Sequence, residues 1–391
     1  MTVPRELAFD VPEYRTRLDA VRRQMAERQL DALVLFGPSN ICYVSCLDND
    51  NLSDLQCVIV PMDRDPILVL FWFEAGRAEN TCWLDEVVLY RGDEEPTGVV
   101  AGVIGRLGLA SGRLGVERPT VGLTVNQFQR FVGHLPDAVI EDSFPAVEIP
   151  RRVKSPAEIG YMRRAAALTD RALDAACAAI DVGVSDGELA ATITNVLYGE
   201  GGEVTSLGPI VAVGYRAGAP HSSFHGSRIK LGDSVFLEFT AQVRRYTAPI
   251  MRSVWMGQPS AEIMRFADAG AAAVATIVRT ARPGLPASEV ALAARADLAP
   301  ILDQVMFHNF YGYPVGIGFP PTWSESLGFY LLATNNEPLQ AGMTFHLPIS
   351  LRRFGEFGVN QSHTMVVTET GAETLTQSTA RLLVIDRAIP G

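Results

Sequence analysis

Apolar and polar positions alternate with two different periods along the first 150 residues. Between Glu13 and Arg28 the apolar residues Leu18, Val21 and Met25 recur at helical spacing, which predicts an amphipathic helix. Short apolar runs that predict buried strands follow at 32–36, 56–61, 66–73 and 86–90, and the residues at 37–40 predict a turn. This alternation of helix and strand predicts a sheet with helices packed against it.

The pattern changes near Ile149 and Pro150, where we place a domain boundary. Proline disfavours helix in the residue before it, and a strong helix start follows at once. Ser155 can act as the N-cap, Pro156 occupies the first helical position, and Glu158 completes a capping box. We therefore predict that a new domain begins here with a long helix, ending at about residue 177.

The second part of the chain mixes helices with strands. It predicts helices at 185–199, 260–279 and 287–303, β-rich chain at 211–257, and a final set of strands at 342–386. A chain of 391 residues is long for a single core. The predicted fold class is therefore α+β, with an α/β domain at 1–150 followed by a mixed domain at 151–391.

Composition narrows the class of partner. The formal net charge of −11 disfavours nucleic acid and anionic membranes. No apolar run reaches the roughly 18–20 residues that cross a bilayer, and the N-terminus lacks the basic-then-apolar pattern of a signal peptide. The five cysteines are odd in number and form no CxxC pair, which is typical of reduced thiols. We expect a cytoplasmic protein without nucleic acid or membrane partners.

A Gly-Asp turn at Gly232 and Asp233 opens the most informative segment. A strand follows, presents an acid at Glu238, turns and returns through residues 246–252. This segment resembles the first ligand motif of the creatinase/aminopeptidase P/methionine aminopeptidase family (peptidase M24), and the chain around Ser155 resembles the entry to its catalytic domain. The resemblance covers nearly the whole chain. It implies an N-terminal creatinase-like α/β domain, a C-terminal pita-bread domain and a homodimer.

The family's metal site takes two Asp, one His and two Glu. The corresponding positions here hold Glu238, Pro249, Val315, Pro348 and Ser362. At least three of these cannot coordinate a hard cation, and a carboxylate-bridged metal pair needs nearly all five ligands. The sequence therefore predicts no metal and no other cofactor, and it argues against an Xaa-Pro peptidase-like metallohydrolase. A single metal held by Glu238 with His346 and His363 stays open as an alternative.

Two residues retain the chemistry of a metal-free site. His221 lies seventeen residues before Glu238 and matches the family position whose imidazole shuttles protons to substrate nitrogen. An imidazole titrates near neutrality and can both give and take a proton. Glu238 can act as a general base on water or as a nucleophile on an amidine carbon. The alternatives are that His221 is a structural histidine at a strand end and that Glu238 is a carboxylate paired with Arg252.

Several further side chains are candidates for substrate binding. Arg252 matches the arginine of the family's Thr-Arg-Thr and can hold a carboxylate. Trp323, Phe224 and His346 are predicted to shape the cavity, and His363 follows the position of a lost glutamate; Asp50 lies on a loop that, in creatinase-like dimers, reaches over the partner's site. In ectoine hydrolases that loop is aromatic. Here it is acidic and rich in amides, so it offers nothing to stack on a flat ring.

The sequence thus predicts a metal-independent hydrolase of a small nitrogenous zwitterion, cleaving a C–N bond in an amidine, guanidine or amide with a His/Glu pair. A lyase that abstracts a proton from a similar zwitterion is the alternative within enzymes. A non-catalytic pita-bread binding protein is the alternative from another class. The expected partners are a small-molecule substrate and a second copy of the chain.

Overall fold

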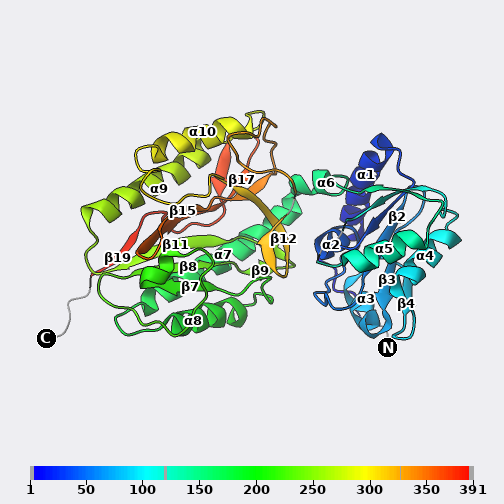
Figure 1. Cartoon of the computed structure of the whole chain (residues 1–391), viewed down its shortest axis with the longest axis horizontal. Helices are drawn as coiled ribbons and strands as arrows, with labels where there is room; N and C mark the ends of the chain where they lie inside the picture. The colour runs from blue at the N-terminus through cyan, green and yellow to red at the C-terminus, as the bar shows by residue number, and fades with distance from the viewer. Residues whose placement is uncertain (1–3, 119–120, 326, 387–391) are drawn as a thin grey trace. The chain divides into compact units, whose positions relative to one another are not determined.

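The computed structural model describes residues 4–118, 121–325 and 327–386, and the chain divides after Arg151 into two compact units (Figure 1). None of the helices in these residues combines the length and apolar character needed to cross a membrane.

The first unit is a mixed sheet flanked by helices. Its strands are β1 (Ala32–Leu35), β2 (Cys57–Pro61), β3 (Ile67–Phe71), β4 (Val87–Tyr90), β5 (Arg113–Val116) and β6 (Val139–Asp142), in the spatial order β4-β3-β2-β1-β5-β6. Its helices are α1 (Val11–Glu27), α2 (Pro38–Ser45), α3 (Ala75–Thr81), α4 (Pro96–Arg106), α5 (Val125–Gly133), α6 (Glu148–Arg152) and the short 3₁₀ helix η1 (Trp72–Glu74). Strand β2 is antiparallel to β1 and β3, whereas β4, β5 and β6 pair in parallel. The predicted α/β character of this unit is confirmed.

Two local predictions for the first unit are wrong. Residues 37–40 do not form only a turn, because α2 begins at Pro38. Proline fits the first helical position, with Gly37 as the N-cap. Ile149 is helical although Pro150 follows it, since both lie in the first turn of α6, where amide groups have no partner inside the helix.

The second unit contains two sheets between pairs of helices. Its strands are β7 (Ile210–Val213), β8 (Ser234–Phe239), β9 (Gln242–Val243), β10 (Tyr246–Thr247), β11 (Ile250–Met256), β12 (Tyr313–Phe319), β13 (Thr322–Ser324), β14 (Thr344–His346), β15 (Ile349–Arg353), β16 (Phe357–Gln361), β17 (Thr364–Val367), β18 (Ala372–Thr374) and β19 (Leu383–Ile385). One sheet runs β18-β17-β14-β12-β10-β9 with β13 beside β12, and the other runs β15-β16-β11-β8-β7 with β19 beside β11.

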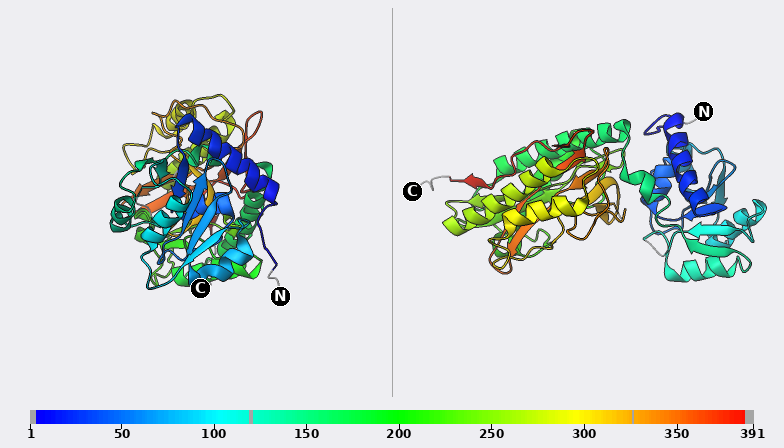
Figure 2. Two further views of the ribbon diagram at one scale, coloured as in Figure 1. Left: turned by 90° about the vertical axis from the view of Figure 1, so that its right-hand side faces the viewer. Right: turned by 90° about the horizontal axis from the view of Figure 1, so that it is seen from above.

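The helices of this unit are α7 (Pro156–Ala179), α8 (Asp186–Gly199), α9 (Ala261–Thr280), α10 (Ala287–Leu298) and the 3₁₀ helix η2 (Gly214–Gly218). Helix α7 packs against α8, and α9 packs against α10 and against β15 and β16 (Figures 1 and 2). The predicted start of α7 is confirmed, because Ser155 and Glu158 form the reciprocal capping box.

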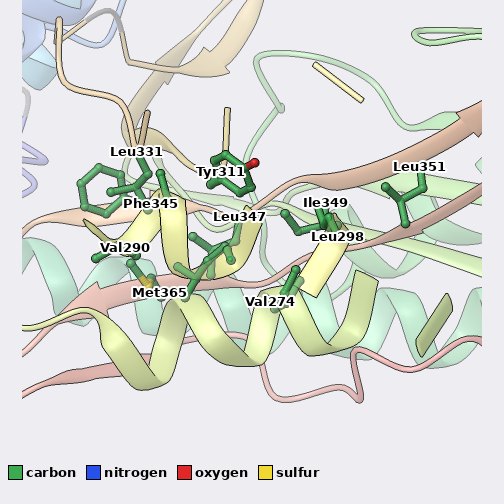
Figure 3. Packing of buried hydrophobic residues seen from close by; sticks show 14 of the residues in the cluster. Val274, Val290, Leu298, Tyr311, Leu331, Phe345, Leu347, Ile349, Leu351 and Met365 are labelled. Carbon is green, nitrogen blue, oxygen red and sulfur yellow. The ribbon is translucent and has the colours of Figure 1, made fainter. Parts of the chain in front are cut away.

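The largest core of the second unit lies between α9, α10 and the strands. Val274 of α9 and Val290 of α10 gather beside Phe345, Leu347 and Ile349, and all five are at most 1% exposed (Figure 3). Burial of each such side chain contributes about 1.5–3 kcal/mol of transfer free energy. This core holds β14 and β15 firmly in place.

Close packing also fixes η2 on the sheet. A Cβ atom at Gly358 of β16 would lie 2.1 Å from the carbonyl oxygen of Ala217 in η2, which leaves no room for a side chain. We expect Gly358→Ala to lower the free energy of unfolding by about 2 kcal/mol, as overpacking does elsewhere. Urea denaturation measures the change. Gly371→Ala is the control, because a Cβ there meets nothing within 4 Å. Equal midpoints for the two variants would contradict this packing.

Candidate active site

A cavity of about 370 Å³ opens among β8, β11, β15 and the chain that precedes β12. Apolar and aromatic side chains form most of its wall, and a few polar groups converge on it, as in many small-molecule sites. Its lining residues are Pro220, His221, Glu238, Met251, Met306, Phe307, His308, Phe310, Tyr313, Pro348, Ser350 and Arg352.

Glu238 is the only carboxylate among these lining residues. Strand β8 is bonded on both sides, so Glu238 stands opposite Ile210 of β7 and Met251 of β11. Its side chain is 8% exposed. Within the described residues no donor hydrogen-bonds to its carboxylate, whereas buried carboxylates normally have such partners. Burial raises its pKa to about 7, opposed by the nearby charge of Arg352.

Arg352 brings a buried cation to the same cavity. Its Nη1 donates to the carbonyl of Ala217 at 2.6 Å and its Nε to the Ser350 hydroxyl at 2.8 Å. Its guanidinium carbon lies 4.4 Å from the ring centre of Phe236. No ion pair within 4.0 Å joins it to Glu238 in the part of the chain that the structure describes, and burial lowers its pKa to about 10. The two opposite charges are therefore near each other but not neutralised by contact.

Arg352 is not among the site residues predicted from the sequence, although the sequence carries a signal for it. Side chains two apart on a strand share a face, so Pro348, Ser350 and Arg352 all point the same way. Pro348 holds the position of a family metal ligand and does line the cavity. The alternation from Pro348 onward would have pointed to Arg352.

His221 reaches the cavity from an irregular segment. It follows η2 by three residues rather than ending a strand, and its φ of 55° is unusual for a residue other than glycine. Its side chain is exposed and lines the cavity together with Glu238. The structure therefore brings together the two residues that the sequence singled out for proton transfer.

An aromatic wall closes one side of the cavity. His308 stacks on Phe310 with ring centres 3.6 Å apart and planes at 11°, and Phe307 lies 4.7 Å from His308. Burial of the imidazole lowers the pKa of His308 to about 4, although part of the side chain is open to solvent. The sequence carried no periodic signal for this wall, because the residues fall in the connection between α10 and β12.

Trp323 and His346 stand behind the cavity. Neither lines it, and both bond to Tyr313, which does. Trp323 Nε1 donates to the Tyr313 hydroxyl at 2.8 Å, and His346 Nδ1 lies 2.7 Å from the same oxygen. Any part that they take in shaping the cavity would therefore act through Tyr313.

Three other predicted binding residues lie away from this cavity, and a fourth belongs to the first unit. Arg252 pairs with Leu237, one position before Glu238, so its side chain leaves the opposite face of the sheet and bonds to Ser378 at 2.8 Å. His363 bonds to Thr376 and lines a separate cavity beside α9. Phe224 lines another cavity beside α8, and Asp50 belongs to the first unit, 3.9 Å from Arg77. The alternative in which Glu238 pairs with Arg252 does not occur among the described residues.

The residues present do not fit a pair of metal ions. Within the described residues no three His, Cys, Asp or Glu side chains converge as metal ligands. Ser362, at the position of a family glutamate, uses its hydroxyl oxygen to bond Met251 N at 2.6 Å and His346 Nε2 at 2.7 Å. The alternative of one metal on Glu238, His346 and His363 also fails this test, because the three do not form such a group.

Both units of the chain resemble known proteins. The model of metallopeptidase family M24 matches residues 160–369, and that of the creatinase/prolidase N-terminal domain matches residues 17–153. The ectoine hydrolase of Halomonas elongata is 29% identical over 97% of this chain and 98% of its own length. Among solved structures, the prolidase of Thermococcus sibiricus superposes with a TM-score of 0.85 at 22% identity, covering 95% of this chain and 99% of that chain. The dipeptidase PepE of Mycobacterium ulcerans gives 0.82 at 24%, covering 97% and 100%.

These matches span both units and agree with the two-sheet architecture of the second one. The chain therefore belongs to metallopeptidase family M24, with a creatinase/prolidase N-terminal domain followed by the pita-bread domain, as the resemblance implied.

Proposed function

We propose that this protein is a hydrolase that cleaves a C–N bond in a small zwitterion without using a metal. The observation that carries the proposal is the buried Glu238 carboxylate, which faces a cavity and accepts no hydrogen bond from the described residues. Burying a carboxylate without hydrogen-bond donors costs free energy unless a ligand supplies them. Membership of family M24 and the similarity to an ectoine hydrolase support a hydrolase acting on a small molecule.

The two buried charges suit a ligand that carries both signs. A cationic amidinium or guanidinium group would find its counter-ion in Glu238, and a carboxylate would find the guanidinium fork of Arg352. The stacked rings of His308 and Phe310 supply a flat surface that residues 46–54 lack. The role first assigned to Arg252 thus passes to Arg352 in this proposal.

The reaction then needs one water and two proton carriers. The oxygen of water bonds to the C–N carbon while Glu238 accepts one of its protons. The C–N bond breaks as His221 delivers a proton to the departing nitrogen. Proton transfer from Glu238 back to His221 through solvent restores both groups. The net change adds a hydroxyl to carbon and a hydrogen to nitrogen.

Incubation with ectoine, creatine and related amidino acids in isotopically labelled water tests this proposal. A hydrolase places labelled oxygen in the product, whereas the lyase alternative expels its leaving group without incorporating label. Binding without any product would favour the non-catalytic alternative and contradict the proposal.

We expect metal removal to leave the activity unchanged. The described residues offer no converging set of metal ligands, so the chemistry has to come from side chains. Activity is compared before and after dialysis against a chelator, with elemental analysis of each sample. A prolidase of the same family, treated in parallel, controls for effective chelation. Loss of turnover that returns with stoichiometric metal would overturn the metal-independent mechanism.

We expect kcat/KM to rise as the pH increases through about 7. Glu238 acts as a base only when ionised, and burial raises its pKa to about 7. At higher pH the rate should fall again, because His221 has to carry a proton in order to deliver it to the departing nitrogen. A pH–rate profile measures both limbs. A profile flat between pH 5 and 8 would argue against Glu238 as the base.

A further inference from the structure

A chain of hydrogen bonds runs from the cavity wall into the sheet. It begins at the Tyr313 hydroxyl, passes through Nδ1 and Nε2 of His346 and ends at the Ser362 hydroxyl, with 2.7 Å at each of the two histidine contacts. Tyr313 lines the cavity, while His346 and Ser362 are both 0% exposed. Burial lowers the pKa of His346 to about 3, so its ring is neutral and carries a single N–H.

The buried end of this chain decides where that N–H lies. Ser362 Oγ accepts the backbone N–H of Met251 at 2.6 Å. Its own proton has one available acceptor among the described residues, the Nε2 atom of His346. If Nε2 carried the proton instead, the Ser362 hydroxyl would be a buried donor without an acceptor, at a cost of about 1–3 kcal/mol. The favoured arrangement therefore has Ser362 donating to Nε2 and the imidazole proton on Nδ1.

The position of the imidazole proton also decides the hydrogen bonds of the Tyr313 hydroxyl at the cavity end of this chain. Tyr313 Oη accepts the N–H of Trp323 at 2.8 Å and now also the Nδ1–H of His346. Both contacts use lone pairs of the phenol oxygen, so its own proton takes part in neither. Within the described residues the Tyr313 hydroxyl has no third partner, and the cavity is the space that remains for its proton.

We propose that Ser362 and His346 set the proton order of this chain so that the Tyr313 hydroxyl donates a hydrogen bond into the cavity beside Glu238. This role rests on the proposed function: Tyr313 donates to the substrate atom that gains electron density as water attacks the carbon. His346 and Ser362 are positioning residues that act through Tyr313. The side chain at the position of a lost metal ligand, Ser362, thereby directs a proton donor rather than a cation.

Nitrogen NMR of the histidine-labelled full-length protein reads the proton order directly. We expect the His346 signals to show a protonated Nδ1 and an unprotonated Nε2 at pH 7, and His346→Asn identifies those signals by their loss. In Ser362→Ala the constraint is gone, and the two nitrogens should move toward the opposite tautomer. A protonated Nε2 in the unmodified protein would overturn the proposal.

Kinetics test the donor role separately. Tyr313→Phe should lower kcat by about 10- to 100-fold and change KM by less, as loss of a transition-state donor does. Tyr90→Phe is the matched control, because it removes a buried tyrosine hydroxyl that bonds to Leu55 in the first unit. An unchanged kcat in Tyr313→Phe would overturn the donor role. If no zwitterion is turned over by the unmodified protein, the proposed function and the donor role fail together, while the NMR result still decides the proton order.

Discussion

Replacement of Glu238 by glutamine should reduce kcat/KM by about 10²–10⁴-fold, the range expected when a general base is lost. Glutamine keeps the shape of the side chain and its place opposite Met251, but it cannot accept a proton from water. The rise in rate through pH 7 should vanish in this variant. Steady-state kinetics across pH 5 to 9 measure both effects. Full activity in Glu238→Gln would remove the basis of the proposed mechanism.

The same substitution should stabilise the fold at neutral and alkaline pH. The pKa of Glu238 is raised from 4.5 to about 7 in the folded protein, so between these values the folded state binds more protons than the unfolded state. The free energy of unfolding therefore falls as the pH rises through this window, by about 3 kcal/mol at most. Glutamine has no charge to bury. Urea denaturation at pH 5 and pH 8 should thus show a gain in Glu238→Gln that is larger at pH 8.

Replacement of Arg352 by methionine should raise KM by about 10- to 100-fold for substrates that carry a carboxylate, because a charge-assisted hydrogen bond is lost. The methyl ester of the same substrate should be affected much less. Arg352→Lys keeps the charge without the planar fork, so its KM should lie between those of the unmodified protein and Arg352→Met. Circular dichroism checks folding, since Arg352 also bonds to Ala217.

Arg252→Met is the control for the proposal that Arg352, and not Arg252, binds the substrate carboxylate. Its side chain leaves the other face of the sheet, so its loss should lower stability and leave the KM of the folded protein unchanged. The reverse result, a large KM effect at Arg252 and none at Arg352, would contradict the placement of substrate binding on β15.

Local signals in the sequence predicted the parts of the fold that short-range chemistry decides. The capping box at Ser155 is complete within four residues, and it marks the start of α7 correctly. Glu238 could be placed in the cavity because its strand and the following turn are contiguous in the chain. The short strand β13 and the exact end of α10, at Leu298 rather than 303, depend on packing between distant segments.

Strand register explains why one arginine was chosen over another. The sequence shows Arg252 on a strand that returns beside Glu238, but it does not show which residues pair. A shift of one position reverses the face of a side chain, and here Met251 rather than Arg252 shares a face with Glu238. Arg352 lies 114 positions after Glu238 in the sequence and meets it only when β15, β16 and β11 assemble.

Strand β8 is bonded on both sides, so the backbone at Glu238 cannot shift to carry the carboxylate into water when it ionises. The Glu238 carboxyl group therefore stays protonated until a cationic ligand binds. Binding of such a ligand near pH 7 should then release that proton to the solvent. Titration calorimetry would register this release as a binding heat that varies with the ionisation enthalpy of the buffer.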